Sequence, residues 1–524
     1  MIVYVRKFIP LNKSLFGVII PCILIAVYIF SFKFNGFLDM PNHLARAFIM
    51  LKCIKNPGDV LCDNYVIKIL PTSYFFSDAT LMLYLQSFPY LIAEKIAIFS
   101  LLVLFIISWY SLYKEINSSI NIGYLAGLSL IINNYLYNGF YAYLISITLC
   151  LFWLTFWWKV KDNKTFFNQI FLSLGMAIIF GFHLAGFLFV FIIYFLYDIH
   201  RMLLLEEKRI KYLMKNSIKN IPIYITFFSL YFYQQGITQE SVLSPIHYKP
   251  LIRKIATILY PFINYSKWFD FLTLLLIFII LLLSVDIFSL RKFCRNFWTM
   301  VSATFFVFFL IAPTAAHGVY DFACRFLPIA YLALFIAIGS TISKNKPVLT
   351  YAMIAILLIN FISNLYYKKI TNTELSKIYH ALKICPENKT LIEINSIRNF
   401  PSQFGSRVSP FPYFSCYYIL EGGALVSGLF DCKYSKHIPY FCYKNQIISH
   451  FDHFKYQFLG ISKIDQEDFI KIAQVFDYVL VITYKNYDYI QSKLKPSFFS
   501  LIYKKDYIYL FKTKKHGILH KSNQ

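Results

Sequence analysis

Long apolar runs alternate with short polar segments from Leu15 to Tyr367, and the alternation then stops. A helix needs about 20 apolar residues to cross the hydrocarbon of a bilayer, and these runs approach that length. The pattern therefore predicts an α-helical polytopic membrane protein. The eleven predicted spans are Leu15–Phe32, Ile96–Leu112, Ile120–Leu136, Phe140–Trp158, Phe166–Phe182, Leu184–Tyr197, Ile218–Tyr233, Phe271–Leu290, Phe297–Ile311, Phe326–Ile342 and Val348–Tyr367.

Two of these spans leave an alternative open. Spans five and six are short and meet at the segment 181–186, so they are either a tight helical hairpin or one broken element.

The first span follows a basic start, as a signal peptide does, but no small-residue cleavage site follows Phe32. An uncleaved first helix is the favoured interpretation.

The polar remainder predicts two external loops and one terminal domain. Loops 33–95 and 234–270 are too long to be simple connections. In the first loop, Pro41–Lys52 has the pattern of an amphipathic helix lying along the membrane interface. Residues 1–367 thus form the transmembrane domain, and residues 368–524 mix helix and strand signals typical of a small α/β domain.

Basic residues predict the orientation, because cytoplasmic loops hold an excess of Lys and Arg. One alternating set of connections is rich in them, including Lys159 to Lys164 and the cluster from Arg201 to Lys219. In the opposite set, the connections 137–139 and 182–184 hold no Lys or Arg, and the connection from Pro313 to Arg325 holds one. An odd number of spans then places residues 368–524 outside the cytoplasm. We expect an integral protein of a bacterial inner membrane with an extracytoplasmic C-terminal domain.

Composition supports the membrane assignment and argues against nucleic acid as a partner. Hydrophobic residues make up 58% of the 524 residues, and the formal net charge is +25. The basic residues are spread between apolar runs instead of forming one patch, so they are explained by topology.

Cysteine and histidine spacing predicts neither a cofactor nor a fixed metal. Of the ten cysteines, Cys53 and Cys62 lie in the first external loop and four more in the terminal domain. An oxidising compartment would permit disulfides there, but the sequence does not assign their pairing. No Cys-x-x-Cys pair or recognisable ligand spacing occurs, and the use of a divalent ion is left open.

A polar string after the first span is the strongest candidate for chemistry. It reads Asp39-Met40-Pro41-Asn42-His43-Leu44-Ala45-Arg46, which holds an acid, an imidazole and a guanidinium within two helical turns. Two interpretations are open: Asp39 is a helix N-cap and Arg46 an interfacial anchor, or they form part of a site.

Other polar residues fall on the same predicted side of the membrane. Charged groups near a bilayer are costly and tend to mark sites, so their shared side favours a functional cluster. Asn138 lies in an Asn-Gly turn between spans three and four, where its amide serves the turn or a ligand. The ionisable members of this set are His183, His247, His317, Asp321 and Arg325.

The layout and the Asp39 string resemble integral-membrane glycosyltransferases of the GT-C superfamily. Those enzymes have an acidic residue in the first external loop, many spans and often an external C-terminal domain. The paired acids seen in several of those families are absent around Asp39. The same string, the Asn-Gly-Phe turn, Leu420-Glu421-Gly422-Gly423 and Leu429-Phe430 also resemble a group of uncharacterised bacterial multi-pass membrane proteins.

The resemblance implies transfer of a sugar from a polyprenyl-phosphate carrier to a glycan, lipid or protein acceptor of the cell envelope. Asp39 would be the general base, and Arg325 or Arg46 would hold the phosphate. His43, Asn138, His183, His317 and Asp321 would line the substrate site.

Two other classes stay open. A transporter or flippase for a lipid-linked or anionic solute would also use cationic residues along a pathway. Such proteins usually place polar groups or broken helices at mid-membrane depth, whereas the ionisable residues here gather near external ends, which favours the enzyme. The third class is a non-catalytic envelope-assembly protein, which no particular feature of the sequence supports.

Overall fold

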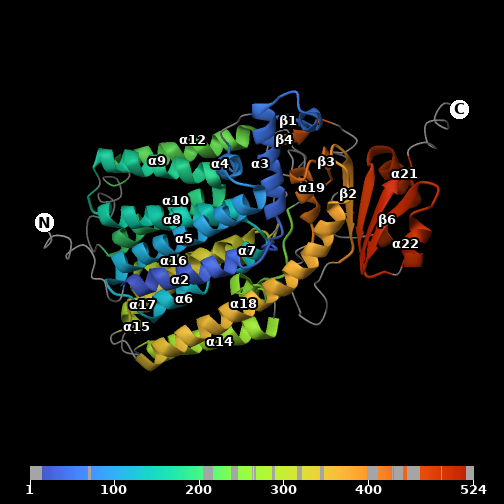
Figure 1. The fold of residues 1–524 in the computed structure, drawn as a ribbon. Coiled ribbons are helices and arrows are strands. Elements are labelled where there is room, and N and C mark those ends of the chain that lie inside the picture. Colours follow the sequence, from blue (N-terminus) through green and yellow to red (C-terminus); the bar gives the residue numbers. More distant parts are fainter. Residues whose placement is uncertain are drawn as a thin grey trace, which may run out of the picture.

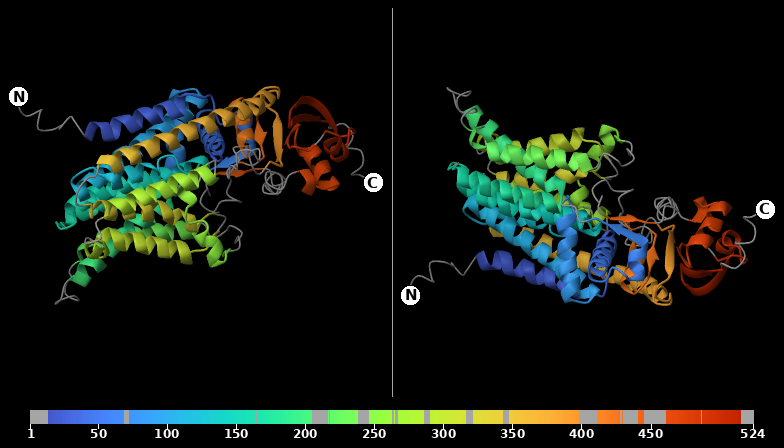
Figure 2. Two further views of the ribbon diagram at one scale, coloured as in Figure 1. Left: turned by 90° about the horizontal axis from the view of Figure 1, so that it is seen from below. Right: turned by 90° about the horizontal axis from the view of Figure 1, so that it is seen from above.

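A computed structural model shows a bundle of long helices joined at one end to a smaller domain built on a β-sheet (Figure 1). The first described helix begins at the end of the bundle far from the C-terminal domain, and two further views show the same division (Figure 2). The described residues are 14–68, 72–163, 165–204, 216, 218–237, 246–262, 264, 267–285, 290–315, 321–342, 347–397, 411–427, 429, 441–444, 461–485 and 487–514.

The bundle is made of apolar helices that lie side by side (Figure 1). Within the described ranges, four helices are long and apolar enough to cross a membrane: α5 (Tyr90–Asn117), α8 (Tyr141–Val160), α10 (Leu184–Leu204) and α18 (Pro347–Leu382). The other long bundle helices are α2 (Ser14–Phe30), α9 (Phe166–Phe182), α12 (Ile221–Ile237), α14 (Lys267–Ser284), α16 (Phe297–Ile311) and α17 (Leu327–Gly339). Ten of the eleven predicted spans thus coincide with a helix, with ends that differ by several residues in some.

The predicted span Ile120–Leu136 is wrong as one helix. The chain instead forms α6 (Ile122–Leu128), leaves helical geometry over 129–133, and forms the single turn α7 (Asn134–Tyr137). Polar side chains in this apolar run redirect the backbone bonds. Asn133 accepts from the Leu136 amide at 2.8 Å, which starts a new turn, and Ser129 Oγ donates to the Ala126 carbonyl at 2.6 Å.

Helices α9 and α10 are separate and pack on each other, so the hairpin alternative holds. His183 is the single residue between them, and its extended backbone (φ −169°) makes the reversal. Its Nδ1 accepts from the amide of Ala185 at 2.9 Å. The reversal therefore fixes the imidazole at the end of the bundle.

Two helices lie at the end of the bundle that carries the sheet, which we call the domain end. There α3 (Met40–Lys55) crosses the ends of the bundle helices and packs on α4 (Phe75–Ser87) (Figure 1). The prediction of an amphipathic helix on the membrane surface needs correction, because nearly every residue from Met40 to Met50 is buried. The C-terminal domain covers its other side through η5 (Phe414–Cys416) and α19 (Tyr417–Leu420).

The C-terminal domain has a five-stranded sheet in the order β3-β2-β5-β7-β6. Strands β3 (Leu425–Val426), β2 (Thr390–Asn395) and β5 (Tyr478–Ile482) are parallel. The hairpin of β6 (Phe499–Lys505) and β7 (Ile508–Thr513) completes it and turns at Asp506, which has a positive φ. The helices of this part are α21 (Gln466–Val475) and α22 (Tyr487–Lys493).

The first loop is joined to this domain by a second, two-stranded sheet. In it β1 (Tyr65–Ile67) pairs antiparallel with β4 (Phe441–Tyr443). Nearby, Cys53 and Cys62 form a disulfide, and Cys442 is disulfide-bonded as well. The short elements not yet named are η1 (Val60–Asn64), α13 (Leu251–Ile255), η2 (Tyr260–Phe262), α15 (Leu290–Cys294), η4 (Ala323–Phe326) and η7 (Ile461–Lys463).

Helix α18 runs without interruption from the bundle into the C-terminal domain, so the predicted division at 367/368 falls inside a helix. At that point Lys368 is fully buried and donates to the Tyr28 carbonyl at 2.6 Å and to Asn35 Oδ1 at 2.7 Å. Asn35 in turn donates to Glu94 at 3.2 Å, and Tyr417 of the C-terminal domain donates to the same carboxylate. This network fixes the segment that leads to Asp39.

Candidate active site

Asp39 lies at the domain end, directly before α3, and is 9% exposed. It occupies the N-cap position of α3 (φ −87°, ψ −11°), but its side chain makes no capping hydrogen bond, so capping does not account for the carboxyl group. Among the described residues no hydrogen bond or ion pair to its carboxyl group is found. The Asp39 carboxyl group is therefore buried and has no hydrogen-bond partner among the described residues.

The surroundings of Asp39 change its affinity for protons. Burial raises the pKa of its carboxyl group to about 8, and the positive charges of Arg325 and then Arg46 limit that rise. A carboxylate with a pKa near the working pH can take a proton from a hydroxyl group more readily than an ordinary aspartate.

The Asn138–Gly139 turn contacts the backbone of Asp39. The Leu38 amide donates to the Tyr137 carbonyl at 2.8 Å, and the Asp39 amide donates to the Asn138 carbonyl at 3.1 Å. Gly139 has φ +72°, and a Cβ there would lie 2.5 Å from the Asp39 nitrogen. The predicted turn is confirmed, and it requires glycine because the two segments are this close.

Asn138 and Asp321 are joined through a residue that the sequence analysis missed. Asn138 Nδ2 donates to Tyr260 Oη at 3.0 Å, and Tyr260 donates to Asp321 Oδ2 at 2.8 Å. Asp321 has a positive φ of 55°. Tyr260 belongs to the second predicted external loop, but one tyrosine among 42 gave no signal of its role.

Arg325 lies in η4, and its guanidinium group contacts His183 and the Phe140 ring. Its Nη1 lies 2.9 Å from His183 Nε2, and its guanidinium carbon lies 4.9 Å from the Phe140 ring centre. Tyr74 Oη also lies 2.9 Å from His183 Nε2. Arg325 Nε is buried and has no hydrogen-bond partner among the described residues. A buried guanidinium with an unused N–H suits an anionic ligand.

His43 and Arg46 form a different arrangement. Arg46 Nε and Nη2 donate to the two oxygens of Asp78 at 2.6 and 2.7 Å, with both side chains fully buried. Arg46 Nη2 also lies 3.0 Å from His43 Nδ1. Burial, and then the charge of Arg46, holds the pKa of His43 well below its usual range, so its ring is neutral. Arg46 is therefore not an interfacial anchor. No sequence signal pointed to Asp78.

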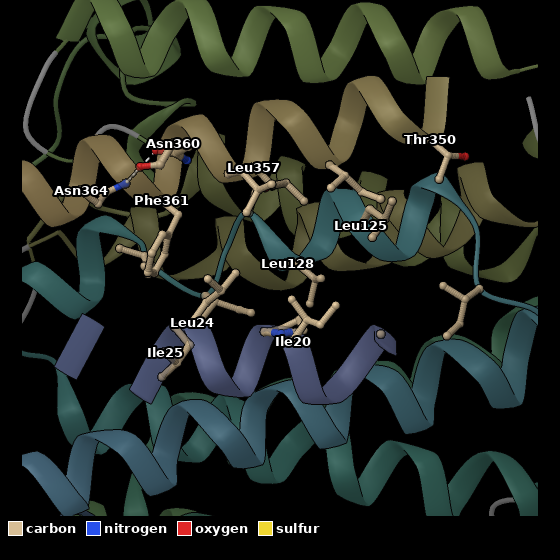
Figure 3. Close-up of a pocket in the computed structure, with 18 of the residues that line it drawn as sticks. Ile20, Leu24, Ile25, Leu125, Leu128, Thr350, Leu357, Asn360, Phe361 and Asn364 are labelled. Atoms are coloured by element: carbon tan, nitrogen blue, oxygen red, sulfur yellow. Dashed lines mark hydrogen bonds between the residues drawn. The ribbon is translucent and has the colours of Figure 1, made fainter. Parts of the chain in front are cut away.

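An apolar groove of about 590 Å³ lies within the bundle (Figure 3). It runs between α2, the broken α6–α7 segment and α18, with Ile20, Leu24, Leu128 and Leu357 among its walls. None of the predicted site side chains within the described residues lines it.

The groove has polar residues toward the domain end. Asn360 and Asn364 bond to each other there, and Asn364 Oδ1 accepts from Tyr137 Oη at 2.8 Å. The carbonyl of the same Tyr137 accepts from Leu38, the residue before Asp39. One side chain thus separates this end of the groove from the Asp39 segment.

The structure brings most of the predicted residues to the domain end. Hydrogen bonds connect Asp39, Asn138 and Asp321, while Arg325 contacts His183 and its charge acts on Asp39. His43 and Arg46 follow on α3. His317 lies outside the described residues. No group of three His, Cys, Asp or Glu side chains with metal-site geometry is found in the described ranges.

No family model and no curated protein matches this sequence. Among solved structures, the chain is similar to "Single-Particle Cryo-EM Structure of Arabinofuranosyltransferase AftD from Mycobacteria", with 8% sequence identity and a TM-score of 0.45. The similarity covers 95% of this chain and 40% of that one, so this chain spans less than half of its length.

Proposed function

We propose that this protein is a membrane glycosyltransferase that moves a sugar from a polyprenyl-phosphate carrier to an envelope acceptor on the non-cytoplasmic side. The observation that carries the proposal is the Asp39 carboxyl group. It is buried, makes no hydrogen bond within the described residues, and lies within electrostatic reach of an arginine that has an unused N–H. A structural aspartate would have its hydrogen bonds filled.

In the proposed reaction, the acceptor hydroxyl oxygen attacks the anomeric carbon of the sugar. The bond from that carbon to the phosphate oxygen breaks, and Asp39 takes the hydroxyl proton. The electron pair of the broken bond leaves with the polyprenyl phosphate, whose growing charge Arg325 offsets. Displacement in line inverts the anomeric centre.

The groove suits the carrier's lipid chain. Its walls are apolar, and it follows α18 from Thr350 to Asn364, a length of about 20 Å at the helical rise per residue. Its polar end is one side chain from the Asp39 segment, where a phosphate head would emerge. Arg325 is assigned the phosphate in preference to Arg46, because Asp78 already occupies two nitrogens of Arg46.

Asn138, Tyr260 and Asp321 are assigned to the sugar or the acceptor. They present an amide, a phenol and a carboxylate in one hydrogen-bonded chain beside Asp39. Such groups match the hydroxyls of a sugar.

A flippase for a lipid-linked solute is the second candidate. The observation that favours it is the non-helical stretch 129–133 beside the groove, since broken helices at membrane depth are common in transporters. Such a protein would move its ligand across the bilayer without breaking a glycosidic bond.

The test uses the full-length protein in proteoliposomes with a panel of polyprenyl-phosphate sugars and envelope acceptors. Release of free polyprenyl phosphate together with a glycosylated acceptor supports the proposal. Movement of the intact lipid-linked sugar between leaflets, with no release, supports the flippase. Neither release nor movement with any member of the panel contradicts both candidates.

A further inference from the structure

Asp39, His43 and Arg46 share one face of α3, because they stand at positions i, i+4 and i+7. Side chains on a helix lean toward its N-terminus, so the Arg46 side chain is directed back along this face toward Asp39. The Cα atoms of the two residues are separated by about 10 Å along the helix axis. Arg46 acts on the charge of Asp39 at this range.

Asp78 reaches the same guanidinium from α4. The two hydrogen bonds of 2.6 and 2.7 Å form a parallel fork, and neither side chain has any exposed surface. A buried arginine is costly unless an acid pairs with it. Asp78 therefore decides how much positive charge the α3 face presents.

We propose that Asp78 is a positioning residue for the base: it clamps Arg46, aligns the start of α3, and offsets the positive charge that Arg46 directs at Asp39. This rests on the proposed function, since it assigns Asp78 a part in preparing that base. Among the described residues, the charged and titratable groups facing Asp39 are Arg325 from η4, Arg46 from α3 and the Cys416 thiol from η5. Asp78 acts on Asp39 through Arg46.

If Asp78 controls the charge that Arg46 directs at Asp39, substitutions of Asp78 and Arg46 should shift the titration midpoint of Asp39, which a purely structural ion pair would not do. In Asp78→Asn, Arg46 keeps its charge without an acid beside it, which favours ionised Asp39 and lowers its titration midpoint. In Arg46→Met, a positive charge is lost, which favours the protonated form and raises the midpoint. The two substitutions break the same pair but shift Asp39 in opposite directions, each by about one pH unit.

The experiment titrates Asp39 directly, without substrate. Infrared difference spectra of the full-length protein in detergent follow the carbonyl stretch of protonated carboxyl groups against pH, and the band absent in Asp39→Asn belongs to Asp39. We expect midpoints in the order Asp78→Asn, wild type, Arg46→Met. The double variant, which removes both charges, should lie between the single variants and near wild type.

The double variant also guards against misfolding, because it leaves no buried charge unpaired. If Asp78→Asn does not fold, the double variant must still titrate below Arg46→Met. A midpoint that does not move, or that moves the same way in both single variants, overturns the clamp. The proposed function can fail while the Asp78 proposal holds. The midpoints of Asp39 would then follow the expected order, but the wild-type protein would transfer no sugar.

Discussion

Among the described acidic residues of the site, Asp39 is the one whose buried side chain has no hydrogen-bond partner. The other acids of the site each accept hydrogen bonds. Asp78 accepts from Arg46, Asp321 from Tyr260, and Glu94 from Asn35 and Tyr417. Those contacts explain why these side chains are buried, and none explains Asp39. An acceptor hydroxyl would supply the missing partner at the moment when a base is needed.

The raised pKa of Asp39 leads to a pH prediction. With a pKa of about 8, roughly a tenth of the free enzyme carries the ionised base at pH 7, and the fraction grows as pH rises. We expect kcat/KM for transfer to increase about tenfold per unit below pH 7 and to level off above pH 8. A profile that is flat from pH 5 to 9 would contradict the assignment.

Arg325 leads to a second prediction. Arg325→Lys keeps one positive charge but loses the planar fork and the contact over Phe140, so the KM for donor should rise by about tenfold or more. The exposed Arg253 at the same end of the bundle gives the matched control, Arg253→Lys. Equal donor KM values in the two variants would remove Arg325 from phosphate binding.

The sequence predicted these residues only where position alone was informative. Asp39, His183 and Arg325 follow or precede apolar runs on one predicted side of the membrane; Arg325 contacts His183, and its charge acts on Asp39. Asp78 and Tyr260 could not be found this way, because their partners are 32 and 61 residues away along the chain. The anchor interpretation of Arg46 fails for the same reason, since the sequence does not reveal its partner Asp78.

At the scale of elements, the interrupted α6–α7 segment decides where the groove lies. A continuous helix would have placed side chains over the space between α2 and α18. Its apolar composition concealed the interruption, since Asn133 and Ser129 act through local hydrogen bonds that no hydropathy pattern records. The spans Phe166–Phe182 and Phe297–Ile311, by contrast, were predicted with their observed ends.

The groove leads to a prediction about donor length. Leu128→Trp places a larger side chain in the groove, so kcat/KM for a long-chain donor should fall by about tenfold while a donor truncated to one or two isoprene units is little affected. Leu282→Trp adds the same group to the exposed side of α14, where Leu282 is 74% exposed. A matching loss with both donors would place the lipid chain elsewhere.

At the scale of the whole molecule, two separate features agree with the predicted orientation. The disulfide between Cys53 and Cys62 lies at the domain end, which suits an oxidising compartment. Basic residues gather at the other end of the bundle, as cytoplasmic segments require, among them Lys159, Lys161, Arg201, Arg291, Lys292 and Arg295. The proposed site would then face the side where lipid-linked sugars, not nucleotide sugars, are available.

Reporter fusions test this orientation. Fusions at Lys164 and Lys346 should report the cytoplasm, and a fusion at Gln524 should report the opposite side. In the same cells, Cys53 and Cys62 should resist alkylation until a reductant is added. A cytoplasmic signal from the Gln524 fusion, or free thiols at both positions, would place the site in the wrong compartment.

The measurement that tests the central claim most directly compares sugar transfer by Asp39→Asn with transfer by Asp63→Asn. Both remove one carboxylate from the first loop, but Asp63 is exposed. Because ionising a buried carboxyl opposes folding as pH rises toward 8, Asp39→Asn should be at least as heat-stable as wild type at pH 8. We predict that it is folded and loses transfer by a factor of about a thousand or more, while Asp63→Asn keeps wild-type activity. Undiminished transfer by folded Asp39→Asn would contradict the account.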